Sequence, residues 1–171
     1  MRRLALLGPN QVDWEEVDDA VVEEPTAIVR PLAVAACDID RPLLFGAIPV
    51  MPPVGLGHEF VAEIVETGDD VTGVAAGDRV AVPFAISCGT CDRCRRGLTA
   101  NCSSVPKGSM FGLGQMGRDW PGVAADLVRV PFATHMLVAF PDGLSPTLAG
   151  SISDVSTAPL GSSLVRLNWF A

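Results

Sequence analysis

The sequence predicts a mainly β domain, built as a mostly antiparallel, partly open barrel with a few short helices. Seventeen glycines and fourteen prolines among 171 residues imply many turns, which favours short strands over long helices. Short apolar stretches recur between these turns, several of them with alternating character. Apolar residues make up 49% of the chain and charged residues 19%, so the chain is globular and long enough to bury a core.

Strand-like stretches follow one another from the N-terminus. In the third, Pro31 suits an edge or bulge position because proline has no amide hydrogen to donate. In the fourth, Phe60, Ala62 and Ile64 alternate with their neighbours, which indicates a strand with two distinct faces. We expect strands within residues 3–8, 11–17, 27–36, 58–68, 80–84, 124–132 and 135–140.

Helical signals are few. Residues 38–46 are compatible with one short helix. Residues 145–158 predict a second helix, with Ser145 as the N-cap and Pro146 in the first turn.

Charge, hydropathy and cysteine usage exclude several classes of function. A net charge of −8 argues against a nucleic-acid partner, whose phosphates require a basic surface. No apolar run reaches the ~20 residues of a membrane span, so we expect no membrane partner. The start of the chain lacks the pattern of a secretory signal, so we expect a cytoplasmic protein. Five cysteines, an odd number, then indicate reduced thiols used as ligands.

The run GLGQMG, residues 112–117, has the spelling of a dinucleotide-binding fingerprint. That fingerprint requires a buried strand before it and a helix after it. Pro106 and Lys107 interrupt the stretch upstream, and Pro121 would break the helix downstream. The sequence therefore predicts a loop here and no cofactor-binding residue in this chain.

Four cysteines, spaced C-x2-C-x2-C-x7-C, form the strongest motif: Cys88, Cys91, Cys94 and Cys102. Four thiolates this close can complete a tetrahedral shell around one Zn²⁺, leaving no open position for chemistry. Backbone amides of such loops can donate hydrogen bonds to the sulfurs, and the arginines at 93, 95 and 96 could offset the negative charge. The alternatives are two disulfides, unrelated thiols or an iron–sulfur cluster, whose usual spacings differ.

The fifth cysteine and one of the two histidines are the remaining candidate metal ligands. Cys37 and His58 could supply two of the three protein ligands that an open zinc site needs. Taken alone, each is more often a core residue, because a buried cysteine is usually a small hydrophobe and a lone histidine is usually a satisfied core residue.

Residues 55–84, GLGHEFVAEIVETGDDVTGVAAGDRVAVPF, followed by the four-cysteine lobe, resemble the zinc-dependent medium-chain alcohol dehydrogenases. The resemblance extends from the first strand to about residue 157. That family joins a GroES-like catalytic domain to a Rossmann domain that binds NAD or NADP. By position, Cys37 and His58 match two ligands of the catalytic zinc, Glu59 matches the acid beside that metal, and the lobe cysteines match the structural zinc site.

The third catalytic ligand is often a cysteine, and this chain has none left for that position. In the sorbitol- and formaldehyde-dehydrogenase-like branches an acidic residue can replace it, and Asp154 stands at the matching position. A second departure is Ile39, because many relatives have a serine or threonine there as a proton relay. The resemblance leaves Asp40 a structural role, bonded to backbone or to an arginine such as Arg41.

The resemblance implies a GroES-like catalytic domain over residues 1–153, with its zinc lobe at 88–102. Residues 154–171 would begin the connection to a missing cofactor domain and then diverge, so no Rossmann domain is expected. The implied activity is zinc-dependent hydride transfer between an alcohol and a carbonyl compound with NAD or NADP, with two zinc sites. A full-length relative would be a candidate homo-oligomer. The alternative is a non-catalytic, zinc-stabilised module or truncated pseudoenzyme, supported by Ile39 and the missing cofactor domain.

Overall fold

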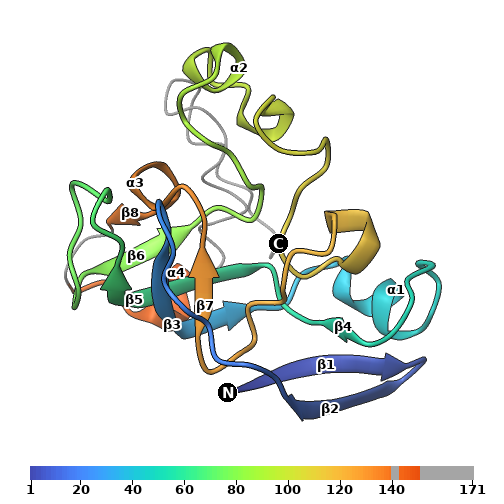
Figure 1. The fold of residues 1–171 in the computed structure, drawn as a ribbon. Helices are drawn as coiled ribbons and strands as arrows, with labels where there is room; N and C mark the ends of the chain where they lie inside the picture. The colour runs from blue at the N-terminus through green and yellow to red at the C-terminus, as the bar shows by residue number, and fades with distance from the viewer. Residues whose placement is uncertain (140–142, 151–171) are drawn as a thin grey trace, which may run out of the picture.

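A computed structural model describes residues 1–139 and 143–150, which form two antiparallel sheets (Figure 1). The smaller sheet has the order β2 (Gln11–Glu16), β1 (Arg2–Gly8), β4 (Val54–Gly55). The larger sheet has the order β7 (Val128–Val130), β3 (Ala27–Ala35), β5 (Glu59–Thr67), β6 (Arg79–Val82), β8 (Val138–Ala139). The mainly β prediction is confirmed, and the two sheets do not close on each other within the described residues.

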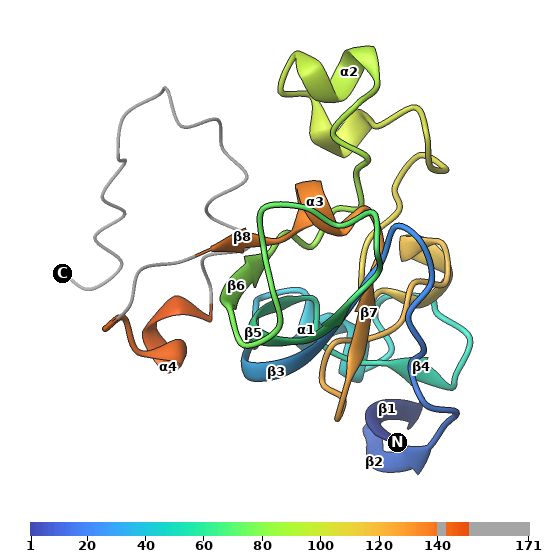
Figure 2. The ribbon, with the colours of Figure 1, turned by 60° about the vertical axis from the view of Figure 1, so that its left-hand side comes forward.

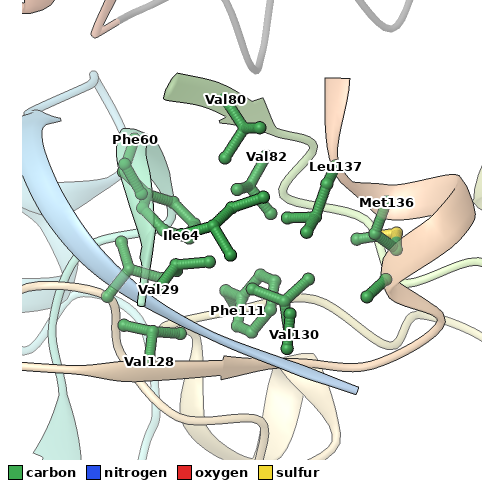
Figure 3. Close-up of a cluster of buried hydrophobic side chains, with 14 of the residues drawn as sticks. Val29, Phe60, Ile64, Val80, Val82, Phe111, Val128, Val130, Met136 and Leu137 are labelled. Carbon is green, nitrogen blue, oxygen red and sulfur yellow. The ribbon is translucent and has the colours of Figure 1, made fainter. Parts of the chain in front are cut away.

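The main core lies on one face of the larger sheet, where side chains from β3, β5, β6 and β7 meet (Figure 3). Phe60, Ala62 and Ile64 of β5 all belong to this core, as their alternation predicted. Val61 points to the opposite face and packs with Ala81 of β6 and Ala149. The strand therefore has two apolar faces, because a short helix covers the second one.

The bulge prediction for Pro31 is confirmed. The pairing of β3 with β5 shifts register between Pro31 and Ala33. The extra residue lets the strand pass a proline that cannot contribute an amide to the ladder. β3 itself is central, because β7 pairs with its first half and β5 with most of its length.

The helices are short, as the glycine and proline content indicated. They are α1 (Asp40–Leu44), α2 (Asp92–Arg95), α3 (Ala133–Met136) and α4 (Pro146–Ala149), with 3₁₀ turns η1 (Thr99–Asn101) and η2 (Gly114–Gly117). α1 and α4 lie within the predicted ranges. Ser145 takes the N-cap position of α4, although its side chain makes no capping hydrogen bond. The predicted helix beyond residue 150 lies outside the described residues.

The prediction of one strand over residues 135–140 is wrong for its first part. His135 and Met136 belong to α3, and β8 holds only Val138 and Ala139 of the described stretch. The chain turns at Phe132, whose φ of 50° is left-handed. Met136 and Leu137 are then both buried in the same core cluster, which consecutive strand residues cannot achieve because they face opposite sides.

The lobe that carries α2 and η1 projects from one end of the molecule, and the β1–β2 hairpin lies at the other (Figures 1 and 2). Cys37 lies in the short connection between β3 and α1, and His58 directly precedes β5. Among the described residues, no helix has the length and apolar character required to cross a bilayer.

Candidate metal centres

The first centre lies in the projecting lobe, where the structure brings the four predicted cysteines together. The Sγ atoms of Cys88, Cys91, Cys94 and Cys102 all lie within 4.8 Å of one another. None of the four forms a disulfide. Cys91 caps the N-terminus of α2, where its sulfur accepts a hydrogen bond from the backbone amide of Cys94, so the helix start orients the side chain of Cys91. The arrangement excludes four unrelated thiols.

Backbone amides of the lobe point at its sulfurs. The amide of Cys91 donates to Cys88 Sγ at 3.4 Å, and the amide of Cys88 donates to Cys102 Sγ at 3.4 Å. The amide of Ser104 also donates to Cys102 Sγ, at 3.4 Å. These are the amide donors expected of a loop that stabilises thiolates.

Hydroxyl groups add donors that the sequence reading missed. Ser104 Oγ donates to Cys88 Sγ at 3.1 Å, and Thr90 Oγ1 donates to the same sulfur at 3.5 Å. Thr90 lies inside the cysteine motif and Ser104 follows it by two residues, so a search for serine and threonine near the cysteines would have found both. Arg93 donates a hydrogen bond to the carbonyl oxygen of Asn101 inside the lobe, and the offset of the thiolate charge by the three arginines stays a hypothesis.

These contacts and the burial of the sulfurs shift the pKa values of the thiols in opposite directions. Burial opposes ionisation of Cys88, but hydrogen bonds from Ser104 and Thr90 outweigh it and lower the pKa of Cys88 to about 5. A hydrogen bond from Ser103 lowers the pKa of Cys91 to about 6. Burial, together with the neighbouring sulfur of Cys91, raises the pKa of Cys94 to about 12. The lobe without a metal therefore holds two ready thiolates and one thiol that must lose a proton when a metal binds.

The second centre joins residues that are far apart in the sequence. Cys37 Sγ lies 3.0 Å from His58 Nε2, and a carboxylate oxygen of Glu59 completes a group within 4.8 Å. Cys37 follows the end of β3, whereas Glu59 is the first residue of β5, so the antiparallel pairing of these strands brings them together. His58 and Glu59 are buried, with 4% and 2% of their surface exposed, and Phe84 packs edge-on against the imidazole.

Asp40 lies behind this centre and contacts both Cys37 and His58. Its Oδ2 accepts a hydrogen bond from the amide of Cys37 at 2.8 Å, which confirms the predicted backbone contact. Its Oδ1 lies 3.7 Å from Nδ1 of His58, a buried nitrogen with no hydrogen-bond partner. Arg41 points elsewhere, over the ring of Phe45. The contact with His58 was missed, because it depends on tertiary packing and not on the local turn.

Two predicted features remain, namely Asp154 and the run at 112–117. Asp154 lies outside the described residues, so its role as a third ligand stays a prediction. The run at 112–117 lies in an irregular segment with one 3₁₀ turn, as the loop prediction required. Its neighbours in space are the residues just before His58, with which Gly112 and Gly114 are in close contact.

Comparison with known proteins places the chain in a family. Residues 23–142 match the alcohol dehydrogenase GroES-like domain. The chain is 36% identical over 122 residues to a glutathione-independent formaldehyde dehydrogenase of Bacillus subtilis, covering 70% of this chain and 30% of that protein.

Solved structures give the same result for the fold. An alcohol dehydrogenase from Thermus sp. ATN1 superposes with a TM-score of 0.79 at 35% identity, covering 89% of this chain and 44% of that one. A cobalt- and zinc-bound thermostable alcohol dehydrogenase from Pyrobaculum aerophilum superposes with a TM-score of 0.73 at 26% identity, covering 90% and 44%. The chain thus spans less than half the length of these relatives.

Proposed function

This chain belongs to the zinc-dependent medium-chain alcohol dehydrogenase family, and on that premise we propose that it is the zinc-binding catalytic domain of an NAD(P)-dependent oxidoreductase. The enzyme would transfer hydride between an alcohol and an aldehyde or ketone. The observation that carries the proposal is the convergence of Cys37, His58 and Glu59 within 4.8 Å of one another. A thiolate, an imidazole and a carboxylate are a ligand set typical of zinc.

The lobe fits a structural zinc. Four sulfurs leave no position for substrate, and amide and hydroxyl donors reduce the cost of gathering their negative charge. We propose Cys88, Cys91, Cys94 and Cys102 as its ligands. The zinc would stabilise the lobe, whose only regular elements are α2 and η1.

The second centre fits an open zinc site. The 3.0 Å between Cys37 Sγ and His58 Nε2 is shorter than the roughly 3.6 Å expected for two ligands of tetrahedral zinc, so binding requires only a small separation. A metal on Nε2 requires the proton on Nδ1, which faces the carboxylate of Asp40. The otherwise unpartnered Nδ1 supports this assignment.

When bound, zinc supplies a Lewis acid for the substrate oxygen. The chain's own residues orient the metal ligands. Asp40 accepts a hydrogen bond from the Cys37 backbone and faces the His58 ring. Glu59 is buried, which keeps its carboxylate beside Cys37 and His58. Ile39 has no group that can carry a proton, so the substrate proton must leave by a route that does not use this side chain.

The finer assignments are also part of the proposal. Asp154 is the third protein ligand of the catalytic zinc. NAD or NADP, bound by residues outside this chain, accepts the hydride. The substrate is a small alcohol or carbonyl compound. The complete enzyme works in the cytoplasm as a homo-oligomer.

Metal counting tests the proposal directly. The purified chain should bind about two zinc ions, one per centre. Cys37→Ser should reduce the count to one, retained by the lobe, and the exposed neighbour variant Asp38→Asn should keep both. A wild-type count of one, unchanged in Cys37→Ser, would contradict the second centre.

Ile39 favours a second candidate, a zinc-stabilised module without turnover. Fusing the chain to the cofactor domain of a relative such as the Thermus alcohol dehydrogenase separates the two functions. Alcohol oxidation that requires Cys37 and His58 supports the enzyme, and an inert fusion with both metals bound supports the module.

A further inference from the structure

The glycine-rich run at 112–117 has no role in the proposed chemistry, yet it lies against the segment that leads into His58. In both ribbon views, the coil that includes η2 lies close to β4 (Figures 1 and 2). β4 ends at Gly55, three residues before His58. The run therefore contacts the approach to the second metal centre.

The closest contact joins Gly112 to Gly57. A methyl group on Gly112 would overlap the carbonyl oxygen of Gly57. That carbonyl belongs to the peptide group whose nitrogen is the backbone nitrogen of His58. Gly112 also has a φ of +67° and Gly57 a φ of +84°, so both positions favour glycine on backbone grounds as well. Any side chain at 112 must displace the peptide that carries His58.

Two further contacts secure the same segment. A Cβ on Gly114 would lie 3.0 Å from the Val54 side chain, so backbone and side chain meet without a gap. Gln115 binds both polar groups of the Met51 backbone: its Oε1 accepts from the Met51 amide at 2.9 Å, and its Nε2 donates to the Met51 carbonyl at 3.2 Å. The run thus contacts residues 51–57 at three positions, namely Met51, Val54 and Gly57.

The opposite side of the Gly57 peptide is held by the same stretch of chain after it turns back. The amide of Gly112 donates to the carbonyl of Pro121, which ties the two arms of the stretch together at 3.0 Å. The amide of Val123 then donates to the Gly57 carbonyl at 3.0 Å. The carbonyl of Gly57 is therefore confined between Gly112 and Val123.

We propose that Gly112 and Gln115 are positioning residues for the second metal centre, because they fix the backbone from which His58 projects. The inference rests on the proposed function, in which Cys37 and His58 are ligands of the catalytic metal. Small displacements of a ligand weaken a metal site because its geometry must be held to a fraction of an ångström. The glycines of this run serve close backbone packing and not a phosphate.

Cobalt titration of the chain, with its lobe first filled by one equivalent of zinc, tests the proposal. Co²⁺ bound by Cys37 and His58 gives visible d–d and thiolate bands, identified by their loss in Cys37→Ser. Gly112→Ala should weaken cobalt binding about tenfold or more and alter these bands. The matched control is Gly73→Ala, at a φ of +82° with no atom within 4 Å of the added methyl. It has a comparable backbone cost and should bind cobalt like the wild type.

A second variant and a metal-independent measurement guard against a simple folding defect. Gln115→Ala removes only the clamp on Met51 and should weaken cobalt binding about threefold. The ¹³Cε1 chemical shift of His58, recorded with zinc in the lobe and no metal in the second centre, should move in Gly112→Ala and stay unchanged in Gly73→Ala. Wild-type cobalt affinity and an unmoved His58 signal in Gly112→Ala would overturn the proposal.

The two proposals fail in different ways. A wild-type chain that binds no second cobalt ion contradicts the metal assignment, and the His58 signal then decides the positioning role alone. A signal that moves in Gly112→Ala but not in Gly73→Ala supports that role, and one that stays unmoved in both overturns it.

Discussion

The two candidate metal centres are assembled in opposite ways. The lobe gathers its four sulfurs from fifteen consecutive residues, and the hydrogen-bond donors lie within these residues or, as with Ser104, directly after them. The second centre joins Cys37 to His58 across 21 positions, and its backbone is held by Gly112 and Val123, which are farther still along the chain. A local centre depends on its own loop, whereas a distributed centre depends on the packing of the whole domain.

This difference predicts where each centre is sensitive. The lobe should respond to its ligands and their immediate donors, and its loss should cost stability because the metal replaces a core there. The metal affinity of the second centre should also depend on residues that do not contact the metal. Disrupting this centre should lower its metal affinity more than it lowers the stability of the fold. Four predictions test this contrast, in order of decreasing expected effect.

Removing one lobe ligand should have the largest effect. Cys91→Ser should abolish zinc binding in the lobe and remove much of the roughly 10 kcal/mol or more that a structural zinc can contribute. Thermal unfolding with metal analysis measures both. The matched variant Cys37→Ser should lose one zinc with little change in the unfolding temperature. Equal destabilisation by the two variants would erase the proposed contrast.

Acidification should empty the lobe over a defined range. The pKa values of Cys88 and Cys91 are lowered to about 5 and about 6, so both are thiolates at neutral pH and protons compete for them only below it. The stabilisation that these lowered pKa values provide is present above the ordinary thiol value of 9.0 and is lost as the pH falls to 6 and then 5. Zinc release followed with a metal-sensitive dye should reach its midpoint in that range. A midpoint above pH 7 would show that proton competition at Cys94, whose pKa is raised to about 12, controls zinc release, and not protonation of Cys88 and Cys91.

Weakening the support of the second centre should reduce its metal affinity without affecting the lobe. Asp40→Asn removes the charge that faces His58 Nδ1, and loss of such partners typically lowers metal affinity 10- to 100-fold. Competition with a chelator of known affinity measures the change. Asp38→Asn makes the same charge change at an exposed neighbouring position and should bind normally. If both variants weaken binding equally, general electrostatics and not the contact with His58 controls affinity.

Removing one hydroxyl donor should have the smallest effect. Ser104→Ala deletes the hydrogen bond to Cys88 Sγ, worth about 1 kcal/mol, and should raise the pKa of that thiol. Zinc release from the lobe should then begin at a higher pH, while metal binding at the second centre stays the same. An unchanged release curve would mean that the backbone amides alone hold the thiolate.

Local sequence patterns were sufficient for much of the fold. The alternation at Phe60, Ala62 and Ile64 predicted both faces of β5, because a strand has a fixed period of two residues. Pro31 predicted an edge or a bulge position because it has no amide hydrogen to donate, and the structure shows the bulge. The strand prediction failed at His135 and Met136, where a left-handed turn at Phe132 starts a short helix. A stretch of six residues is too short for its apolar pattern to distinguish that helix from a strand.

By itself, the sequence determined the cysteine lobe, because four cysteines within fifteen consecutive residues can come together through local turns alone. The residue types at 37, 58 and 59 also indicated a metal centre, through their resemblance to a family. Only the tertiary structure revealed that Asp40 faces His58 and that Gly112 presses on the peptide before it. The physical reason is that such contacts join segments whose separation in space is set by strand pairing and core packing, and not by their distance along the chain.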